Sequence, residues 1–406
     1  MIASHTQKEL EQGPQLSIIK FVGCLLEDAY HLRASDIHLD PEDEEVKVRF
    51  RIDGVLYDTN SFNRTMYSEV LSRIKIIAHL RTDEHQAPQD GRFRYFLQKD
   101  GRPIDVRVSI VPTFYEENAV MRLLVDQAEE FSLKSLGFSE DNQKKILRAI
   151  QKPHGMILAT GPTGSGKTTT LYTLIKILNT RRASIITIED PVEYSIRGIN
   201  QIQANPKAGL TFANGLRSIL RQDPNIIMVG EIRDSETAGI AVNTALTGHL
   251  LLSTLHTNDA ITTLPRLIDM KIEPYLIVST VNVAIGQRLV RKICPDCKEE
   301  RKITPAEAKS LAEVFPTGIN PTQSQIFYAG KGCENCVESG YRGRIGVHEV
   351  LQVDANIREA VLRKANADEI RKIAVKQGMT TMFEDGLQKA KAGVTTIEEV
   401  LRLLHE

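Results

Sequence analysis

The chain has 406 residues, 41% of them hydrophobic and 25% charged, which is ordinary for a globular protein and enough for roughly two to four domains. Its formal net charge of -1 excludes a global basic field that would draw it to nucleic acid or anionic lipid, so any polyanion site must be local. No apolar run approaches the roughly 18 residues of a membrane-spanning helix, and the polar start is unlike a signal peptide. We therefore expect a cytosolic chain with at most peripheral membrane attachment.

The first part of the chain is predicted to be a small α+β domain. We expect residues 1–15 to be disordered and residues 16–126 to form the domain, with a helix over 16–33 where apolar residues recur at helical spacing. In "EVKVRFRIDGVL", apolar residues alternate with lysine and arginine up to an Asp-Gly pair, which predicts two strands joined by a tight turn. A helix over 64–80, a hairpin turning at Asp100-Gly101 and a last strand, "AVMRLLV", complete the predicted antiparallel sheet.

One face of this predicted sheet is rich in arginine. The period-two alternation of strand side chains places on it Arg49, Arg51, Arg92, Arg94, Arg107 and Arg122. The pattern alone fits two interpretations: a solvated polar face, or a surface that faces phosphate groups.

The second part of the chain is predicted to be an α/β domain. After a linker over 127–140, near-continuous apolar runs such as "GMILAT", "SIITIE" and "HLLLSTL" alternate with helices over 141–293. This alternation is typical of a parallel sheet that is covered on both faces. Residues 294–340 then contain two pairs of cysteines, and residues 341–406 are charged and predicted to be helical.

The stretch "GPTGSGKT" fits the phosphate-loop pattern G-x-x-x-x-G-K-[ST], and it lies between an apolar strand and a helix, as the pattern requires. Its glycines let successive backbone N–H groups point at a phosphate, and the helix N-terminus adds positive potential. We expect Lys167 to reach the β- and γ-phosphates and Thr168 to bind Mg²⁺ through its hydroxyl. The predicted nucleotide-binding residues are Gly161, Pro162, Thr163, Gly164, Ser165, Gly166, Lys167, Thr168 and Thr169.

Acidic residues lie near the ends of the predicted strands around this loop. Ligands of a parallel sheet bind at the carboxyl ends of its strands, so these acids are expected to contact magnesium or water; the alternative is ordinary strand-end caps. They are Glu189, Asp190, Glu193, Asp223 and Glu231. Glu231 ends "IIMVGE", where most P-loop nucleotidases end the apolar run in an aspartate, and it could polarise an attacking water.

Two histidines flank the strand "LLLSTL". His249 and His256 are seven positions apart, so strict alternation would place them on opposite faces of the strand. That placement argues against both binding one metal ion. Taken alone, each is most simply a structural histidine.

Four of the five cysteines form two C-x-x-C pairs separated by 35 residues. Four thiolates at the corners of a tetrahedron suit a structural Zn²⁺ ion. The alternatives are ordinary reduced cysteines or a redox dithiol, and the second pair makes a redox role less favourable. The predicted zinc ligands are Cys294, Cys297, Cys333 and Cys336.

Together these stretches resemble one family, the secretion and type IV pilus assembly ATPases, in the branch that secretes proteins or extends pili. The resemblance covers nearly the whole chain. Its marks are, in order, "ASDIHLDP", "RIDG", "PQDGR", "DVRVS", "GPTGSGKTTTLY", "TIEDPVEY", "LRQDPNIIMVGEIRD", "TALTGHLLLSTLHTNDA" and "GYRGRIGVHEVL".

The resemblance implies a PAS-like N-terminal domain followed by a RecA-like P-loop ATPase core, with a zinc-binding tetracysteine insertion and a helical C-terminal region. It implies ATP, Mg²⁺ and Zn²⁺ as ligands, and a ring hexamer that drives an inner-membrane platform protein from the inner face of the membrane. The chain looks like a short form without the long N-terminal docking extension of many members. No nucleic-acid partner is expected.

The family's roles are carried over to matching positions. Glycine before the glutamate is the family norm, so Glu231 takes the role of the catalytic glutamate, while Glu189 and Glu193 match acids near the metal and the γ-phosphate. Both histidines match the family's histidine box, near the γ-phosphate. The arginines that match those approaching the nucleotide from the N-terminal domain are Arg92, Arg107 and Arg122, which would act as arginine fingers.

The leading hypothesis is an ATP-hydrolysing motor of a type II secretion or type IV pilus-like machine. One alternative is a nucleic-acid translocase, for example in DNA uptake, although the chain has no net positive charge and no tryptophan. A second alternative is a nucleotide-binding switch that does not hydrolyse ATP. The presence of Lys167, Thr168 and Glu231 argues against such a switch.

Overall fold

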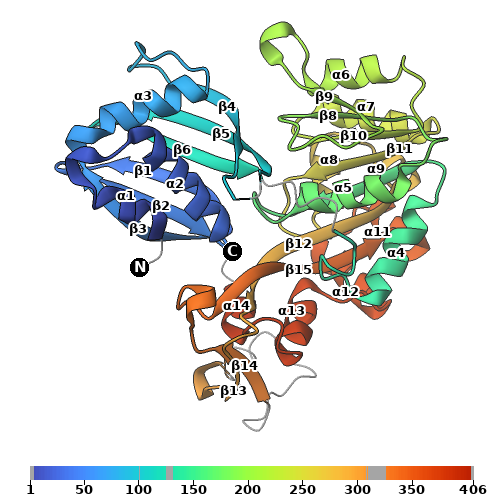
Figure 1. Cartoon of the computed structure of the whole chain (residues 1–406). Helices are drawn as coiled ribbons and strands as arrows, with labels where there is room; N and C mark the ends of the chain where they lie inside the picture. Colours follow the sequence, from blue (N-terminus) through green and yellow to red (C-terminus); the bar gives the residue numbers. More distant parts are fainter. Residues whose placement is uncertain (1–3, 100, 125–130, 308, 310–325, 404–406) are drawn as a thin grey trace. The chain divides into compact units, whose positions relative to one another are not determined.

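A computed structural model of the chain describes residues 4–99, 101–124, 131–307, 309 and 326–403. The chain forms two compact units, residues 1–127 and residues 128–406, each with its own sheet and its own buried core (Figure 1).

The first unit is an antiparallel sheet of six described strands, in the order β3-β2-β1-β6-β5-β4, with helices on its apolar face. Leu25 of α2 and Ile74 of α3 pack against inward-facing residues of the strands, such as Val48, and all three are fully buried. Its elements are α1 (Ser4–Leu10), η1 (Gly13–Gln15), α2 (Ile18–His31), β1 (Ala34–Pro41), β2 (Glu45–Ile52), β3 (Val55–Asn63), η2 (Arg64–Met66), α3 (Tyr67–Ile77), β4 (Gln89–Phe96), β5 (Pro103–Pro112) and β6 (Glu117–Leu124).

The first hairpin has the predicted turn. Asp53 and Gly54 both have positive φ, at 50° and 92°, as a tight turn between two twisted strands requires. The strand β1 was not predicted, although it is central to the sheet. Its sequence alternates, because Ile37 and Leu39 are buried while His38 between them is partly exposed. The turn predicted at Asp100-Gly101 lies partly outside the described residues.

The prediction that residues 1–15 are disordered is wrong for the described part. Residues 4–10 form α1, and Thr6 is fully buried. The carboxylate of Asp28, in the last turn of α2, accepts hydrogen bonds from the backbone N–H of Thr6 at 2.7 Å and from its hydroxyl at 2.8 Å. A residue distant in sequence thus caps this helix, so no local pattern announces it.

The second unit is built on a seven-stranded sheet in the order β15-β12-β7-β11-β10-β8-β9. Neighbouring strands run parallel from β9 to β12, and only β15 runs antiparallel. Its elements are α4 (Glu140–Ile150), β7 (Gly155–Thr160), α5 (Lys167–Leu178), β8 (Ile185–Glu189), β9 (Asn200–Gln203), η3 (Pro206–Ala208), α6 (Phe212–Ile219), β10 (Ile226–Val229), α7 (Ser235–Leu246), β11 (Leu250–Leu255), α8 (Thr263–Asp269), α9 (Pro274–Thr280), β12 (Val281–Ile293), β13 (Lys298–Lys302), β14 (Ile326–Gly330), η4 (Glu334–Cys336), β15 (Tyr341–Gln352), α11 (Ala355–Leu362), α12 (Ala367–Lys376), α13 (Met382–Lys391) and α14 (Ile397–Arg402).

The predicted parallel sheet covered on both faces is confirmed. Strands β7, β8, β10 and β11 are buried at every position. Successive residues of β7 enter different cores, since Met156 and Leu158 belong to one apolar cluster and Ile157 and Ala159 to another. The apolar runs in the sequence follow from this two-sided burial.

Two long strands carry the cysteine region. The cysteine pairs lie between the end of β12 at Ile293 and the start of β15 at Tyr341, and β13 and β14 pair with each other there. The prediction of a wholly helical region over 341–406 is wrong at its start, because residues 341–352 form the sheet strand β15 before the helices begin. Glycines and alternating side chains in "YRGRIGVHEV" favour a strand there over a helix.

The described end of the predicted linker packs onto β15. Leu133 and Phe138 are buried, and the Phe138 ring stacks on His348 with ring centroids 3.6 Å apart. The backbone N–H of Gly346 donates to the carbonyl of Leu136 at 3.1 Å. Residues 133–138 are therefore held by the second unit.

Candidate nucleotide site

The phosphate loop lies between β7 and α5, and its backbone geometry requires glycine. Gly161, Gly164 and Gly166 have φ values of 142°, 79° and 86°. A Cβ atom at Gly161 would lie 2.3 Å from the carbonyl oxygen of Gln287, so no larger residue fits there. Gly166 is the N-cap of α5, which leaves the first N–H groups of that helix available to a phosphate.

Lys167 is the first residue of α5 and is nearly buried. Its Nζ atom donates to the carbonyl oxygens of Gly161 and Pro162, both at 2.9 Å, so the ammonium group lies inside the curve of the loop. Burial lowers the pKa of Lys167. The charge of Glu231 opposes this change by raising the pKa, and the charge of Arg288 lowers it further. These interactions place a carboxylate and a second cation close to the lysine that is expected to bind phosphate.

Strand β12 supports the loop from the side, which the sequence analysis missed. The Nε2 atom of Gln287 donates to the carbonyl of Ser165 at 2.6 Å, and its Oε1 atom accepts from the hydroxyl of Thr170 at 2.8 Å. Gln287 therefore ties the loop to the first turns of α5. Only the pairing of β12 with β7 brings these residues together, and the two segments are more than a hundred positions apart in sequence.

Glu231 follows β10 and lies beside His256, which follows β11. The His256 Nε2 atom donates to Glu231 Oε2 at 2.9 Å, and Arg233 NH2 contacts Glu231 Oε1 at 2.5 Å. Strands β7, β11 and β10 are consecutive in the sheet, so Gly161, His256 and Glu231 all leave its carboxyl edge. The predicted proximity of Glu231 and His256 to the loop follows from this order.

Glu231 is held in the ionised form. Burial raises the pKa of its carboxyl, but hydrogen bonds from Arg233 and His256 outweigh burial, and the pKa lies below its ordinary value. A carboxylate that stays charged at neutral pH can accept a proton from water. Sequence reasoning named His256 here but missed Arg233, whose only signal was its position in "GEIRD".

Gly230 explains why this strand does not end in an aspartate. Its backbone N–H donates to Ile188 at 2.7 Å, and a Cβ atom at this position would lie 3.3 Å from Glu189 Cα. The backbone that follows β10 thus runs close to β8 at this point, so a side chain here would need β8 to shift by a few tenths of an ångström.

The two other carried-over acids do not share the environment of Glu231. Glu189 is buried, and its oxygens accept hydrogen bonds from the hydroxyl of Tyr172, from Thr187 at 2.6 Å and from Gln201 at 3.2 Å. These contacts satisfy the carboxylate inside the unit, as a structural acid requires. The backbone of Glu193 hydrogen-bonds to the same Tyr172 hydroxyl.

Two predicted residues lie at the opposite edge of the sheet. His249 precedes β11, its carbonyl accepts from the N–H of Gly155 at the start of β7, and its ring contacts Thr244. Asp223 precedes β10 and has positive φ. The expectation that either residue adjoins the phosphate loop of its own chain is corrected, because strand length separates the two edges.

The arginine face of the first unit is a row across the sheet. Strand register places Arg92 opposite Arg107 and Arg107 opposite Arg122. Arg122 in turn lies opposite Asp36, and its Nε atom donates to that carboxylate at 2.7 Å. On the same face, the guanidinium of Arg94 forms a bidentate pair with Asp105, at 2.8 and 3.0 Å.

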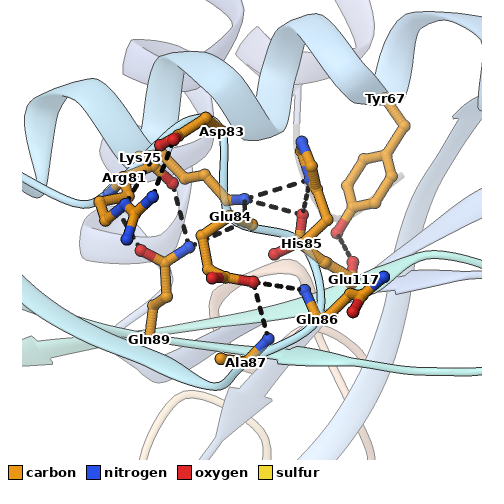
Figure 2. A network of polar contacts seen from close by, with 10 residues as sticks. All are labelled: Tyr67, Lys75, Arg81, Asp83, Glu84, His85, Gln86, Ala87, Gln89 and Glu117. Atoms are coloured by element: carbon orange, nitrogen blue, oxygen red, sulfur yellow. Dashed lines mark hydrogen bonds and ion pairs between the residues drawn. The ribbon is translucent and has the colours of Figure 1, made fainter.

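A buried ion pair holds the loop that leads into β4 (Figure 2). Lys75 of α3 is 1% exposed, and its Nζ atom donates to Glu117 Oε2 at 2.8 Å and to the carbonyl of Glu84 at 2.6 Å. His85 contacts the same carboxylate oxygen at 2.7 Å. At Gly91, next to Arg92, a Cβ atom would lie 2.5 Å from the carbonyl of Ala78. The loop therefore fixes where the arginine row starts.

The four paired cysteines converge on one point. Their sulfur atoms all lie within 4.8 Å of one another. The Sγ–Sγ distance is 3.8 Å for Cys294 and Cys333, 3.8 Å for Cys297 and Cys336, and 3.6 Å for Cys333 and Cys336. A tetrahedron with bonds of about 2.3 Å has edges of about 3.8 Å, so the set fits a zinc ion. Backbone N–H groups of Cys333 and Gly340 donate to the Cys336 sulfur at 3.2 and 3.3 Å, as expected for a thiolate ligand.

No helix among the described residues is long and apolar enough to cross a membrane.

Comparison with known proteins identifies the family. Residues 11–402 match the Type II/IV secretion system protein family. Type II secretion system protein E of Xanthomonas campestris pv. campestris is 49% identical over 96% of this chain and 68% of its own. Type II secretion system ATPase E of Vibrio cholerae is 45% identical over 98% of this chain and 77% of its own length. Type IV pilus assembly ATPase PilB of Myxococcus xanthus is 45% identical over 95% of this chain and 67% of its own length.

Solved structures agree on the fold. The Legionella pneumophila ATPase DotB aligns with a TM-score of 0.68 and 22% identity, covering 95% of each chain. The pilus retraction motor PilT with bound ADP aligns with a TM-score of 0.64 and 25% identity, covering 94% of this chain and 96% of that chain. The family match and the curated relatives agree with the phosphate loop, Glu231 and the four cysteines described above. The chain therefore belongs to the Type II/IV secretion system protein family of secretion and pilus assembly ATPases.

Proposed function

We propose that this chain hydrolyses ATP to drive the assembly of a pilus or pseudopilus at the inner face of the cell membrane. The observation that carries the proposal is the edge of the second sheet, where Lys167, Glu231 and His256 follow neighbouring strands. Secretion and pilus relatives match at similar identity, 49% and 45%, so both kinds of machine fit the proposal.

The described residues can supply each part of phosphoryl transfer to water. Lys167 and the backbone N–H groups at the start of α5 would bind the β- and γ-phosphates. Thr168 would hold Mg²⁺, which neutralises charge on the phosphate oxygens when it is bound. Glu231, kept ionised by Arg233, would orient and deprotonate the attacking water, and His256 would hold Glu231 in place.

The arginine row is proposed to stabilise the charge that develops on the γ-phosphate. Like charges that face each other across neighbouring strands are destabilising. The row of Arg92, Arg107 and Arg122 therefore favours an anionic partner, even though Asp36 already pairs with Arg122. We infer that the row acts on nucleotide held by the ATPase unit of a ring hexamer. The Arg107→Ala variant should then lose most turnover in the assembled protein, whereas Arg94→Ala, which lies outside the row, should keep it.

The experiment that tests the proposal is phosphate release from the purified chain with Mg²⁺ and ATP. Wild type should release phosphate, and Lys167→Ala should reduce the rate about 10²-fold or more. Lys176→Ala, which alters the last turn of the same helix, is the control and should keep the wild-type rate. An unchanged rate in Lys167→Ala would refute the site. Strong stimulation by DNA would instead support a nucleic-acid translocase.

A further inference from the structure

The segment that carries His256 has no regular secondary structure. It connects the end of β11 at Leu255 to the start of α8 at Thr263. The His256 side chain is about half exposed, at 51%, and its ring contacts Glu231. We call residues 257–262 the histidine loop. The position of the His256 ring depends on the contacts that hold the backbone of this loop.

One end of the histidine loop is tied to the phosphate loop. The N–H of Thr257 donates to the hydroxyl of Thr160 at 3.2 Å, and that hydroxyl donates to the Thr257 carbonyl at 2.7 Å. Thr160 is the last residue of β7 and directly precedes Gly161. This contact fixes the histidine loop only at its beginning.

The other end is held by two charged residues from the C-terminal part of the chain. Glu349 of β15 accepts a hydrogen bond from the N–H of Ala260 at 2.7 Å, and its other oxygen accepts from the N–H of Met382 at 3.3 Å. Arg371 of α12 contacts Asp259 at 2.5 Å. Asp259 in turn accepts from the N–H of Thr262 at 2.7 Å and so closes the turn into α8.

The Glu349 contact is built into the fold. Glu349 is 2% exposed, and a Cβ atom at Gly286 on β12 would lie 2.8 Å from the Ala260 nitrogen and 2.9 Å from Glu349 Cγ. Only glycine at 286 leaves room for this carboxylate to reach the loop. Burial, and next the charge of Asp259, raise the pKa of Glu349. An apolar residue at this position would remove the acceptor of the Ala260 and Met382 N–H groups.

We propose that Glu349 and Arg371 are positioning residues for ATP hydrolysis, which clamp the histidine loop so that His256 stays within hydrogen-bond distance of Glu231. Neither residue is among the predicted site residues. The inference rests on the proposed function, because His256 and Glu231 act together there. It also gives the C-terminal helices α12 and α13 a direct mechanical connection to the reacting end of the site.

The test is steady-state ATP hydrolysis by the full chain with Glu349→Ala, Glu349→Gln and Arg371→Ala. A clamp that acts on the water-activating groups should lower kcat by about 10- to 100-fold in Glu349→Ala and leave KM for ATP unchanged. Glu349→Gln keeps one acceptor for the Ala260 N–H and should recover much of the rate. Arg371 is partly exposed, so Arg371→Ala should fold and still lower kcat.

Matched controls separate positioning from stability. Arg363→Ala breaks an exposed ion pair with Glu369 of α12, the helix that carries Arg371. Glu399→Ala removes a buried acid that pairs with Arg291 near the end of β12 and with Arg402 of α14. Both should keep the wild-type kcat, even where the melting temperature falls as far as in Glu349→Ala. Equal loss of kcat in these controls would show that Glu349 has only a structural role.

A double-mutant cycle decides the route. If Glu349 acts through His256, Glu349→Ala should change kcat less than about twofold in a chain that already carries His256→Ala. Full additivity, or a wild-type kcat in His256→Ala alone, would overturn the inference. A wild-type chain that does not hydrolyse ATP, or a Glu231→Gln chain that does, would instead refute the proposed function and remove the basis of the clamp.

Discussion

At the scale of single residues, the charge of Glu231 depends on its two neighbours. Arg233→Ala removes a hydrogen bond that lowers the pKa of Glu231. The raising effect of burial on this pKa is then opposed chiefly by the hydrogen bond from His256. The pKa of Glu231 should therefore rise. Since the base must be ionised to accept a proton, the acid limb of the kcat profile should move to higher pH.

This shift is measured as kcat against pH for wild type, Arg233→Ala and Arg217→Ala. Arg217 pairs with Glu236 on the surface, and its variant should keep the wild-type profile. The protonation of ATP itself is common to all three proteins and cancels in the comparison. An acid limb at the same pH in Arg233→Ala and wild type would contradict the assigned role of Arg233.

The buried pair of Lys75 and Glu117 makes a separate prediction about stability. Lys75→Met leaves a carboxylate without its ammonium partner, and breaking a buried pair from one side typically costs about 3 kcal/mol or more. Calorimetric unfolding should show this loss in the first unit. Lys75→Met combined with Glu117→Leu should recover much of it, because neither charge is then buried alone.

The control for this prediction is Arg81→Met, which breaks the exposed pair with Asp83 and should leave unfolding unchanged. If Lys75→Met unfolds like wild type, or if the double variant is less stable than Lys75→Met, the pair is not what holds the loop before β4.

Sequence alone placed some site residues well and others badly, for identifiable reasons. The phosphate loop and Glu231 were predictable because a short local pattern and a strand end define them. His249 and Asp223 were misplaced because an apolar run does not show which of its ends lies at the edge with the phosphate loop. Gln287 and Glu349 were invisible, since only strand pairing brings them to the site.

At the scale of elements, β12 and β15 join the nucleotide site to the cysteine region. The parallel strands were predictable from their apolar runs, whereas β1 and β15 were not predicted. In both of these strands, polar or glycine positions interrupt the apolar run. The central position of β1 is evident only from its two neighbouring strands, β2 and β6. Local pattern thus gave the buried strands, and long-range pairing gave the rest.

The tetracysteine region should depend on zinc for its packing. Strand β14 packs on the C-terminal helices, where Phe327 belongs to the same buried cluster as Leu387 and Ile397. Protein purified without added metal should contain about one zinc ion per chain, because four converging sulfurs form a closed site. Chelation should speed hydrogen exchange in β13, β14 and α13 and leave β7 and β11 protected.

Zinc content and exchange are measured together, with Cys24→Ser as the control. Cys24 lies in the first unit, outside the four converging sulfurs, and its variant should keep the metal. Cys333→Ser should lose it. Zinc content well below one ion per chain in wild type would refute the metal site.

At the scale of the whole molecule, the phosphate loop and the arginine row lie in different units. The second unit carries the phosphate loop, Glu231 and the four converging cysteines, and the first unit carries the arginine row. Family membership covers both units, since the match runs over residues 11–402.

Glu231 is proposed to activate the water that attacks ATP bound at the phosphate loop. This role is tested most directly by measuring ATP binding and phosphate release in parallel for wild type and Glu231→Gln, both with Mg²⁺ and with zinc retained. We expect equal affinity for ATP and a fall in phosphate release of about 10²-fold or more in the variant. Wild-type phosphate release by Glu231→Gln would contradict the claim.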